Sequence, residues 1–379
     1  MRRIIALLII LNFIIVFPSI RFFSKFLNIY FFAVYVILFN AFLVLIISKK
    51  EAIKKILSLP IWGGVVIILS IANYFIYPII DARKKTVNSG STGDDAMILA
   101  AHSFKNSGKI YDVFINNHTP ISPGPAWVIF NTPFSLLDLY FLFSPFYVLV
   151  ALLLLKKYFG NIISNLFLGI LFSALVTIEL FLNGHDILPF SLGFLICTLL
   201  IFENFKNKLG LLSTILISFL LGIVCTSRVI FFSVPFVFYF LTKSLNQKKS
   251  LILLMVSSTV FWGFNGYYYA INQNYQPLHL IQKSVHLSSL PLLILGSLAF
   301  LIALFFIIKF LKKSEIRDWF LILGSLFALL LIPVSIADLY KQDFNFKLWE
   351  GANYFMPIIP FLALYVLFYF FNPYQKPNE

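Results

Sequence analysis

Charged residues are scarce in this chain of 379 residues. They make up 12% of it, whereas about a quarter is usual for a soluble domain. Hydrophobic residues account for 60%, and the mean hydropathy is +0.93. This balance excludes an ordinary soluble enzyme and an intrinsically disordered chain.

Cysteine and acidic residues are also few. The two cysteines, Cys197 and Cys225, both lie in apolar runs, a placement typical of buried packing residues and not of a disulfide scaffold or a metal pair. Lysine and arginine number 29 against 15 acidic residues, which gives a net charge of +14. The basic residues form short clusters between long apolar runs instead of one stripe, so we predict no nucleic-acid partner.

The long apolar runs predict a polytopic membrane protein. A span needs about twenty mostly apolar residues, because the hydrocarbon core of a bilayer is about 30 Å thick. By this measure we predict an all-α fold in which residues 1–379 form a single integral-membrane domain with about twelve transmembrane helices. The predicted spans are 4–20, 27–47, 57–80, 137–155, 162–182, 187–203, 209–226, 229–242, 251–271, 289–311, 319–337 and 353–371. Because 209–242 is too long for one helix and short for two, we expect a break near Arg228.

The lysines and arginines predict the orientation of the spans. Short cytoplasmic loops carry an excess of both residues. This rule places the chain in a cell (inner) membrane with both termini on the cytoplasmic side. Glu179 lies within a span, about one turn from its outer end, and almost no other ionisable residue lies at mid-membrane. Ion-coupled transporters usually keep such residues at mid-membrane. We therefore expect the polar chemistry to take place at the outer face.

Residues 81–136 form the one long loop outside the membrane. We predict a first helix over 93–107, ended by Gly108 in the left-handed conformation that glycine favours. A second short helix over 126–131 follows the rigid sequence SPGP at 122–125. Both helices are apolar enough to lie in the membrane interface.

An acidic pair, Asp94 and Asp95, lies in the first turn of the predicted first helix. In one interpretation, the two carboxylates only complement the helix dipole. In another, one of them is a catalytic base that accepts the proton of a substrate hydroxyl. Adjacent helical residues point about 100° apart, so we expect only one carboxylate to face a given site. A divalent metal bound by this pair with His185 and Asp186 is an alternative, but the spacing of these ligands is not diagnostic, and we predict no cofactor.

The loop resembles the GT-C superfamily of integral-membrane glycosyltransferases over residues 91–134. The resemblance rests on GDDA at 93–96, GKIYD at 108–112 and PISPGPAW at 120–127. It implies transfer of a sugar from a polyprenyl-phosphate carrier to a glycan, lipid or protein acceptor on the extracytoplasmic face, in the biosynthesis of a cell-envelope polysaccharide. Asp94 corresponds to the proposed catalytic base of the family, and Asp95 to the second acidic residue.

One position departs from the family pattern. Many relatives have an Arg-Tyr pair before the prolines of a late span, whereas this chain has Asn353-Tyr354. The phosphate or acceptor contact of that arginine must therefore come from another residue here, or be absent.

Four further residues are candidates for substrate binding. Arg228 is an arginine at the outer end of two adjoining spans, where it either binds the donor phosphate or extends to lipid headgroups. Glu179, His185 and Asp186 either form a polar wall of the sugar pocket or serve only the turn and the helix start.

Two other functions compete with glycosyl transfer. A transporter or lipid flippase predicts a polar path through mid-membrane, and the sequence has little sign of one. An O-antigen ligase or polymerase relies on arginines and histidines in a large late outer loop, whereas here the late outer loops 272–288 and 338–352 are short. The sequence does not determine the sugar, the acceptor or the stereochemical outcome.

Overall fold

A computed structural model describes residues 2–87, 93–115, 119–207, 209–278 and 315–371, together with isolated helical positions between 294 and 309. Within these residues the fold is almost entirely helical, which confirms the all-α class. The described strands are β1 (Phe114–Ile115) and β2 (Thr119–Pro120), an antiparallel pair with Phe114 opposite Pro120.

Seven described helical segments are long and apolar enough to cross a membrane, as a polytopic membrane protein requires. They are Ile5–Phe26, Tyr30–Ser48, Ile61–Asp81, Tyr140–Ser173, Ile187–Lys206, Gln247–Ile271 and Ile316–Lys341. Three shorter apolar helical segments cover Leu211–Thr226, Val229–Thr242 and Ile359–Phe371. The predicted span 289–311 lies mostly outside the described residues, and the total of twelve spans stays a prediction.

The first helical segment is longer than the sequence indicated. It consists of α1 (Arg2–Leu11), the π-helical turn η1 (Asn12–Val16) and α2 (Phe17–Phe26). The predicted span 4–20 had placed Arg21 and Lys25 in the following loop, and this placement is wrong, because both residues lie on α2. After it come α3 (Tyr30–Ser48), α4 (Lys50–Leu57) and α5 (Ile61–Val87).

The segment α8 (Phe143–Ser173) is a hairpin of two helical arms. Gly160 has non-helical dihedral angles (φ 84°, ψ 174°) that glycine adopts readily, and the chain reverses there. The Ser164 hydroxyl lies 3.3 Å from the Leu152 carbonyl oxygen, so the arms run side by side. The two arms correspond to the predicted helices 137–155 and 162–182, except that the second helix is interrupted at Ala174, where α9 (Leu175–Leu182) begins.

The rest of the chain adds further apolar helices. They are α10 (Ile187–Lys206), α11 (Leu211–Thr226), η3 (Val229–Ser233), α12 (Val234–Thr242), α13 (Gln247–Ile271), α16 (Ile316–Lys341), η4 (Glu350–Phe355) and α17 (Ile359–Phe371). The predicted break near Arg228 is confirmed, since α11 ends at Thr226 and Arg228 has an extended backbone.

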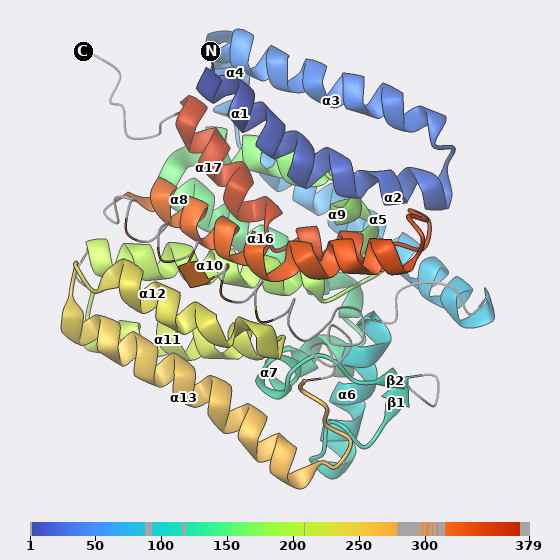
Figure 1. Cartoon of the computed structure of the whole chain (residues 1–379), viewed down its shortest axis with the longest axis vertical. Coiled ribbons are helices and arrows are strands. Elements are labelled where there is room, and N and C mark those ends of the chain that lie inside the picture. The colour runs from blue at the N-terminus through green and yellow to red at the C-terminus, as the bar shows by residue number, and fades with distance from the viewer. Residues whose placement is uncertain are drawn as a thin grey trace.

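The loop between α5 and α8 carries two helices, α6 (Gly93–Ser107) and α7 (Pro125–Leu136), followed by the short turn η2 (Tyr140–Leu142). The bounds of α6 are those predicted, and Gly108 has φ +72°. Helix α7 extends beyond the predicted 126–131. Small residues on α6 allow it to pack against α7, and Trp127 of α7 is fully buried. Figure 1 shows α6, α7 and the strand pair on the side of the molecule away from the N-terminus.

Candidate active site

Asp94 is fully buried in the first turn of α6. The hydroxyl of Tyr77, on α5, donates a hydrogen bond to Asp94 Oδ2 at 3.1 Å. A carboxylate at this position also gains from the positive end of the helix dipole. The buried charge is thus held in place by one neighbouring helix and by its own.

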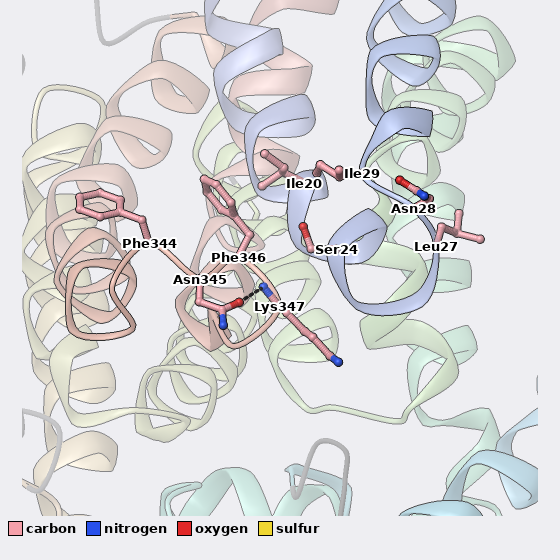
Figure 2. Close-up of a pocket in the computed structure, with 9 residues that line it drawn as sticks. All are labelled: Ile20, Ser24, Leu27, Asn28, Ile29, Phe344, Asn345, Phe346 and Lys347. Carbon is pink, nitrogen blue, oxygen red and sulfur yellow. Dashed lines mark hydrogen bonds between the residues drawn. The ribbon is translucent and has the colours of Figure 1, made fainter.

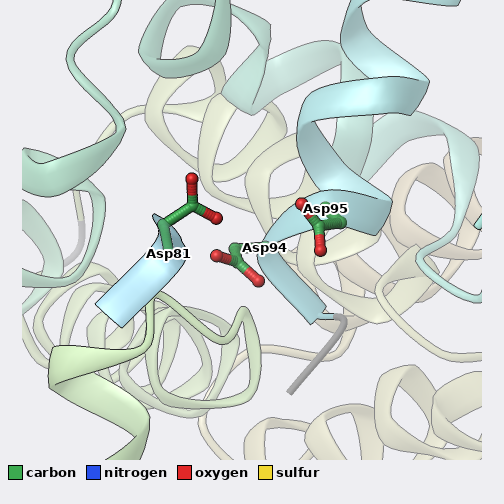
Figure 3. Close-up of side chains that lie close together, drawn as sticks. All are labelled: Asp81, Asp94 and Asp95. Atoms are coloured by element: carbon green, nitrogen blue, oxygen red, sulfur yellow. The ribbon is translucent and has the colours of Figure 1, made fainter. Parts of the chain in front are cut away.

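Two further carboxylates lie beside Asp94. They belong to Asp81 and Asp95. One carboxylate oxygen from each of the three residues lies within 4.8 Å of the corresponding oxygens of the other two. Figure 3 shows Asp81 extending from α5 toward the first turn of α6, where the other two residues lie. Oxygens of the adjacent residues Asp94 and Asp95 thus lie close together, and the expectation that only one of the two faces a given site stays a prediction. Sequence reasoning missed Asp81, whose signal is its place at the polar end of an apolar run.

The turn between α9 and α10 packs directly against this carboxylate group. Gly184 has φ +70°, and a Cβ atom there would lie 2.8 Å from a ring carbon of Tyr77 and 3.4 Å from Cβ of Asp94. The Tyr140 hydroxyl donates to the Gly184 carbonyl oxygen at 3.0 Å. Only glycine satisfies both the backbone conformation and the available space.

His185 contacts the start of α6. A Cβ atom on Gly93 would lie 2.7 Å from Cγ of the His185 ring, so the ring covers the residue that precedes Asp94. His185 Nδ1 lies 3.1 Å from Asp186 Oδ1. The structure therefore brings His185 next to the acidic pair, as a polar wall of one site requires.

Asp186 and Arg228 form a bidentate ion pair. Arg228 Nη1 and Nη2 each donate to one carboxylate oxygen of Asp186 at 2.9 Å, and Nη1 also donates to the Ser227 carbonyl oxygen at 2.6 Å. Burial alone would raise the pKa of Asp186, but the Arg228 guanidinium and His185 outweigh it and lower that pKa to about 2. The charge of Arg228 is thus largely neutralised. This geometry supports a positioning role for Arg228 better than the phosphate-binding role considered from the sequence.

The Pro-rich turn before α7 is fixed to the residues that precede Arg228. The backbone N–H of Gly124 donates to the Ser227 carbonyl oxygen at 3.3 Å, and that of Trp127 donates to Thr226 Oγ1 at 2.9 Å. A Cβ atom on Gly124 would lie 1.7 Å from the Thr226 carbonyl oxygen, so only glycine permits this approach. The loop 81–136 and the break after α11 are therefore held together.

The carboxylate of Glu179 binds neither the Asp81, Asp94 and Asp95 trio nor Arg228 but two basic residues of α2. Arg21 and Lys25 of α2 bind the two carboxylate oxygens at 2.9 and 3.0 Å. Arg21 Nη1 also donates to Asn353 Oδ1 at 2.9 Å. The Arg21 guanidinium thus contacts the side chain of Asn353, which lies 332 positions later in the chain. Sequence reasoning missed both basic residues.

The described carboxylates offer one set of possible metal ligands. In the set considered from the sequence, Asp186 is engaged by Arg228 and by His185. The trio of Asp81, Asp94 and Asp95 instead has a spacing at which one divalent cation could bind several oxygen ligands. Oxygen donors of this kind suit Mg²⁺, Mn²⁺ or Ca²⁺.

Comparison of the chain with protein-family models, with curated proteins and with solved structures finds no match. The function must therefore be argued from the chemistry of the site.

Proposed function

We propose that the chain is an integral-membrane glycosyltransferase that moves a sugar from a polyprenyl-phosphate carrier to an acceptor hydroxyl. The observation that carries this proposal is the fully buried Asp94, hydrogen-bonded to Tyr77 and accompanied by two carboxylates, at the end of the apolar part of α5. The resemblance of residues 91–134 to the GT-C superfamily supports the same assignment.

Asp94 is the general base in this proposal. An acceptor hydroxyl is a poor nucleophile near neutral pH, and a carboxylate within hydrogen-bond reach activates it. The hydroxyl proton passes to Asp94 while the acceptor oxygen bonds to the anomeric carbon and the bond from that carbon to the carrier phosphate breaks. The carrier leaves as a phosphate anion, so that no separate acid is required. Tyr77 orients the carboxylate through its hydrogen bond to Oδ2.

The proposed topology has twelve spans, both termini in the cytoplasm and the loop 81–136 outside a cell (inner) membrane. The asymmetry of lysines and arginines supports it. A cysteine substituted at the exposed Ser107 should react with an impermeant thiol reagent in intact cells, since both native cysteines are buried. Labelling only after permeabilisation would reverse the orientation.

The function is tested by comparing the carbohydrate of cell envelopes with and without the protein. We expect one sugar substituent to disappear on deletion and to return with the wild-type chain but not with Asp94→Asn. An unchanged envelope, or complete restoration by Asp94→Asn at equal expression, would overturn the proposal. Loss of whole polymers from the cell surface, with their sugar composition unchanged, would instead favour a flippase.

A further inference from the structure

A second polar cluster, formed by Arg21, Lys25 and Glu179, lies apart from the carboxylate trio. Arg21 and Glu179 are each 6% exposed, whereas the Lys25 side chain is 25% exposed. Among the described ion pairs, both cations share this one carboxylate. Two positive charges against one negative charge leave a surplus of positive charge beside the buried Arg21, and this surplus attracts a further anion.

Arg21 also has hydrogen-bonding capacity to spare. Its Nη1 donates to Glu179 and to Asn353, but its Nε is buried and has no hydrogen-bond partner among the described residues. Buried donors are almost always paired in folded proteins. The planar fork of a guanidinium fits two oxygens of a phosphate, so an incoming phosphate can satisfy the unpaired donor.

Two cavities lie along the helical segment that carries Arg21 and Lys25, and both are lined by neighbours of the cluster in the chain. A pocket of about 630 Å³ (Figure 2) is lined by Ser24 of α2, the residue before Lys25, and by Asn345 and Lys347 of the segment before η4. A groove of about 580 Å³ runs between the first helical segment and α3, lined mostly by apolar side chains. The groove reaches Phe17, one turn before Arg21.

We propose that Arg21 and Lys25 bind the phosphate of a membrane lipid and that the groove between α1 and α3 holds its hydrocarbon chain. The anion site rests on the charge balance and the unpaired Nε. The identity of the lipid as a polyprenyl phosphate rests on the proposed function. Position supports the link, because the Glu179 carbonyl oxygen accepts from the Asn183 N–H at the start of the turn that packs against Asp94.

The proposal is tested by binding to the purified full-length chain in detergent. The ligands are a radiolabelled polyprenyl phosphate, the corresponding polyprenol and inorganic phosphate. We expect the lipid phosphate to bind at least about tenfold more tightly than either of the other two, since each lacks half of the recognised chemistry. Equal binding of the polyprenol, or of inorganic phosphate, would overturn the proposed lipid-phosphate site.

Variants separate anion binding from a merely structural ion pair. Arg21→Gln should weaken binding of the lipid phosphate by about tenfold or more, because charge-assisted hydrogen bonds are lost. Glu179→Gln removes the competing anion and should strengthen binding, whereas a purely structural cluster predicts no gain. Arg317→Gln is the matched control, because Arg317 also pairs with carboxylates but lies on α16 and is 38% exposed.

Two further outcomes keep the test decisive. If Arg21→Gln does not fold, Lys25→Gln, at the more exposed member of the pair, should weaken the same binding, and unchanged binding would overturn the proposal. The assay involves no sugar transfer. If the lipid phosphate does not bind specifically but Asp94→Asn is inactive in sugar transfer, the anion site is overturned and the proposed function stands. If the lipid phosphate binds specifically but the wild-type chain has no transferase activity, the anion site stands and the proposed function is overturned.

Discussion

Asp94→Asn is the change that tests the proposed chemistry most directly. Asparagine has nearly the size of aspartate, and its amide oxygen can still accept the hydrogen bond from Tyr77, so this fully buried side chain should keep its place. The substitution also removes one of three neighbouring negative charges, which relieves repulsion among them. We therefore expect normal expression and an unfolding temperature close to that of the wild type.

The expected loss of activity follows from the role of a base. General acid–base catalysis typically contributes about 10²–10⁴ in rate, equivalent to roughly 3–5 kcal/mol of transition-state stabilisation. Asp95→Asn and Asp81→Asn should each cost less than about tenfold, because these half-buried carboxylates act on the site only through their charge. Tyr77→Phe removes one hydrogen bond to the base and should lower kcat by about two- to tenfold.

The assay is transfer of a labelled sugar from a polyprenyl-phosphate donor by the purified chain in proteoliposomes, with donor KM and kcat measured separately. Near-normal kcat in Asp94→Asn with loss in Asp95→Asn would show that the wrong member of the pair was assigned. Normal kcat in both would reduce the pair to helix-dipole partners. Comparable losses from substitution of all three carboxylates would indicate that the trio acts as a cation site instead. In that case wild-type activity should also be lost on chelation and restored by added divalent cation.

Three further predictions concern the surroundings of Asp94. Gly184→Ala should lower the unfolding temperature and kcat, because a left-handed conformation costs a non-glycine residue about 1–2 kcal/mol and the new Cβ would contact Tyr77. Gly210→Ala, where a Cβ has open space around it, is the control in the thermal unfolding measurement. Asp186→Asn should destabilise the protein by roughly 3–5 kcal/mol at neutral pH by leaving Arg228 unpaired. The pKa of Asp186 is lowered to about 2, so its contribution is complete above about pH 4 and is lost as the pH falls toward 2; a stability difference that persisted unchanged at pH 2 would contradict the ion pair. Arg228→Gln should lower stability without raising the donor KM, and Arg228→Lys should restore stability only in part; a large rise in KM with stability intact would return the phosphate to Arg228.

Local signals in the sequence account for much of the fold. Gly108 marks the end of α6 correctly, because helix ends depend on residues within one turn of them. The same holds for the break between α11 and η3 at Arg228, which lies where an apolar run exceeds the length of one span. Hydropathy likewise located the two arms of the α8 hairpin, because Lys156 and Lys157 interrupt the apolar run before Gly160.

The contacts that define the two polar clusters could not be predicted in the same way. Arg21 and Glu179 are separated by 158 positions in the chain, and their ion pair depends on how α2 packs against α9. Asp81 joins the acidic pair only because the first turn of α6 lies beside α5 at this residue. Hydrophobic periodicity determines which faces of helices are buried, but it does not determine which helices become neighbours.

The roles of Arg21 and Arg228 follow from charge balance and not from residue type. Arg228 faces one carboxylate in a bidentate pair, so that the pair carries no net charge and both terminal nitrogens are occupied. Arg21 shares its carboxylate with Lys25 and keeps a buried Nε without a partner among the described residues. A phosphate is attracted by net positive charge and by free donors, and it is repelled by a concentration of carboxylates. In the proposed arrangement the cationic cluster binds the donor phosphate, whereas Asp94, beside a pair without net charge, takes the proton of the acceptor hydroxyl.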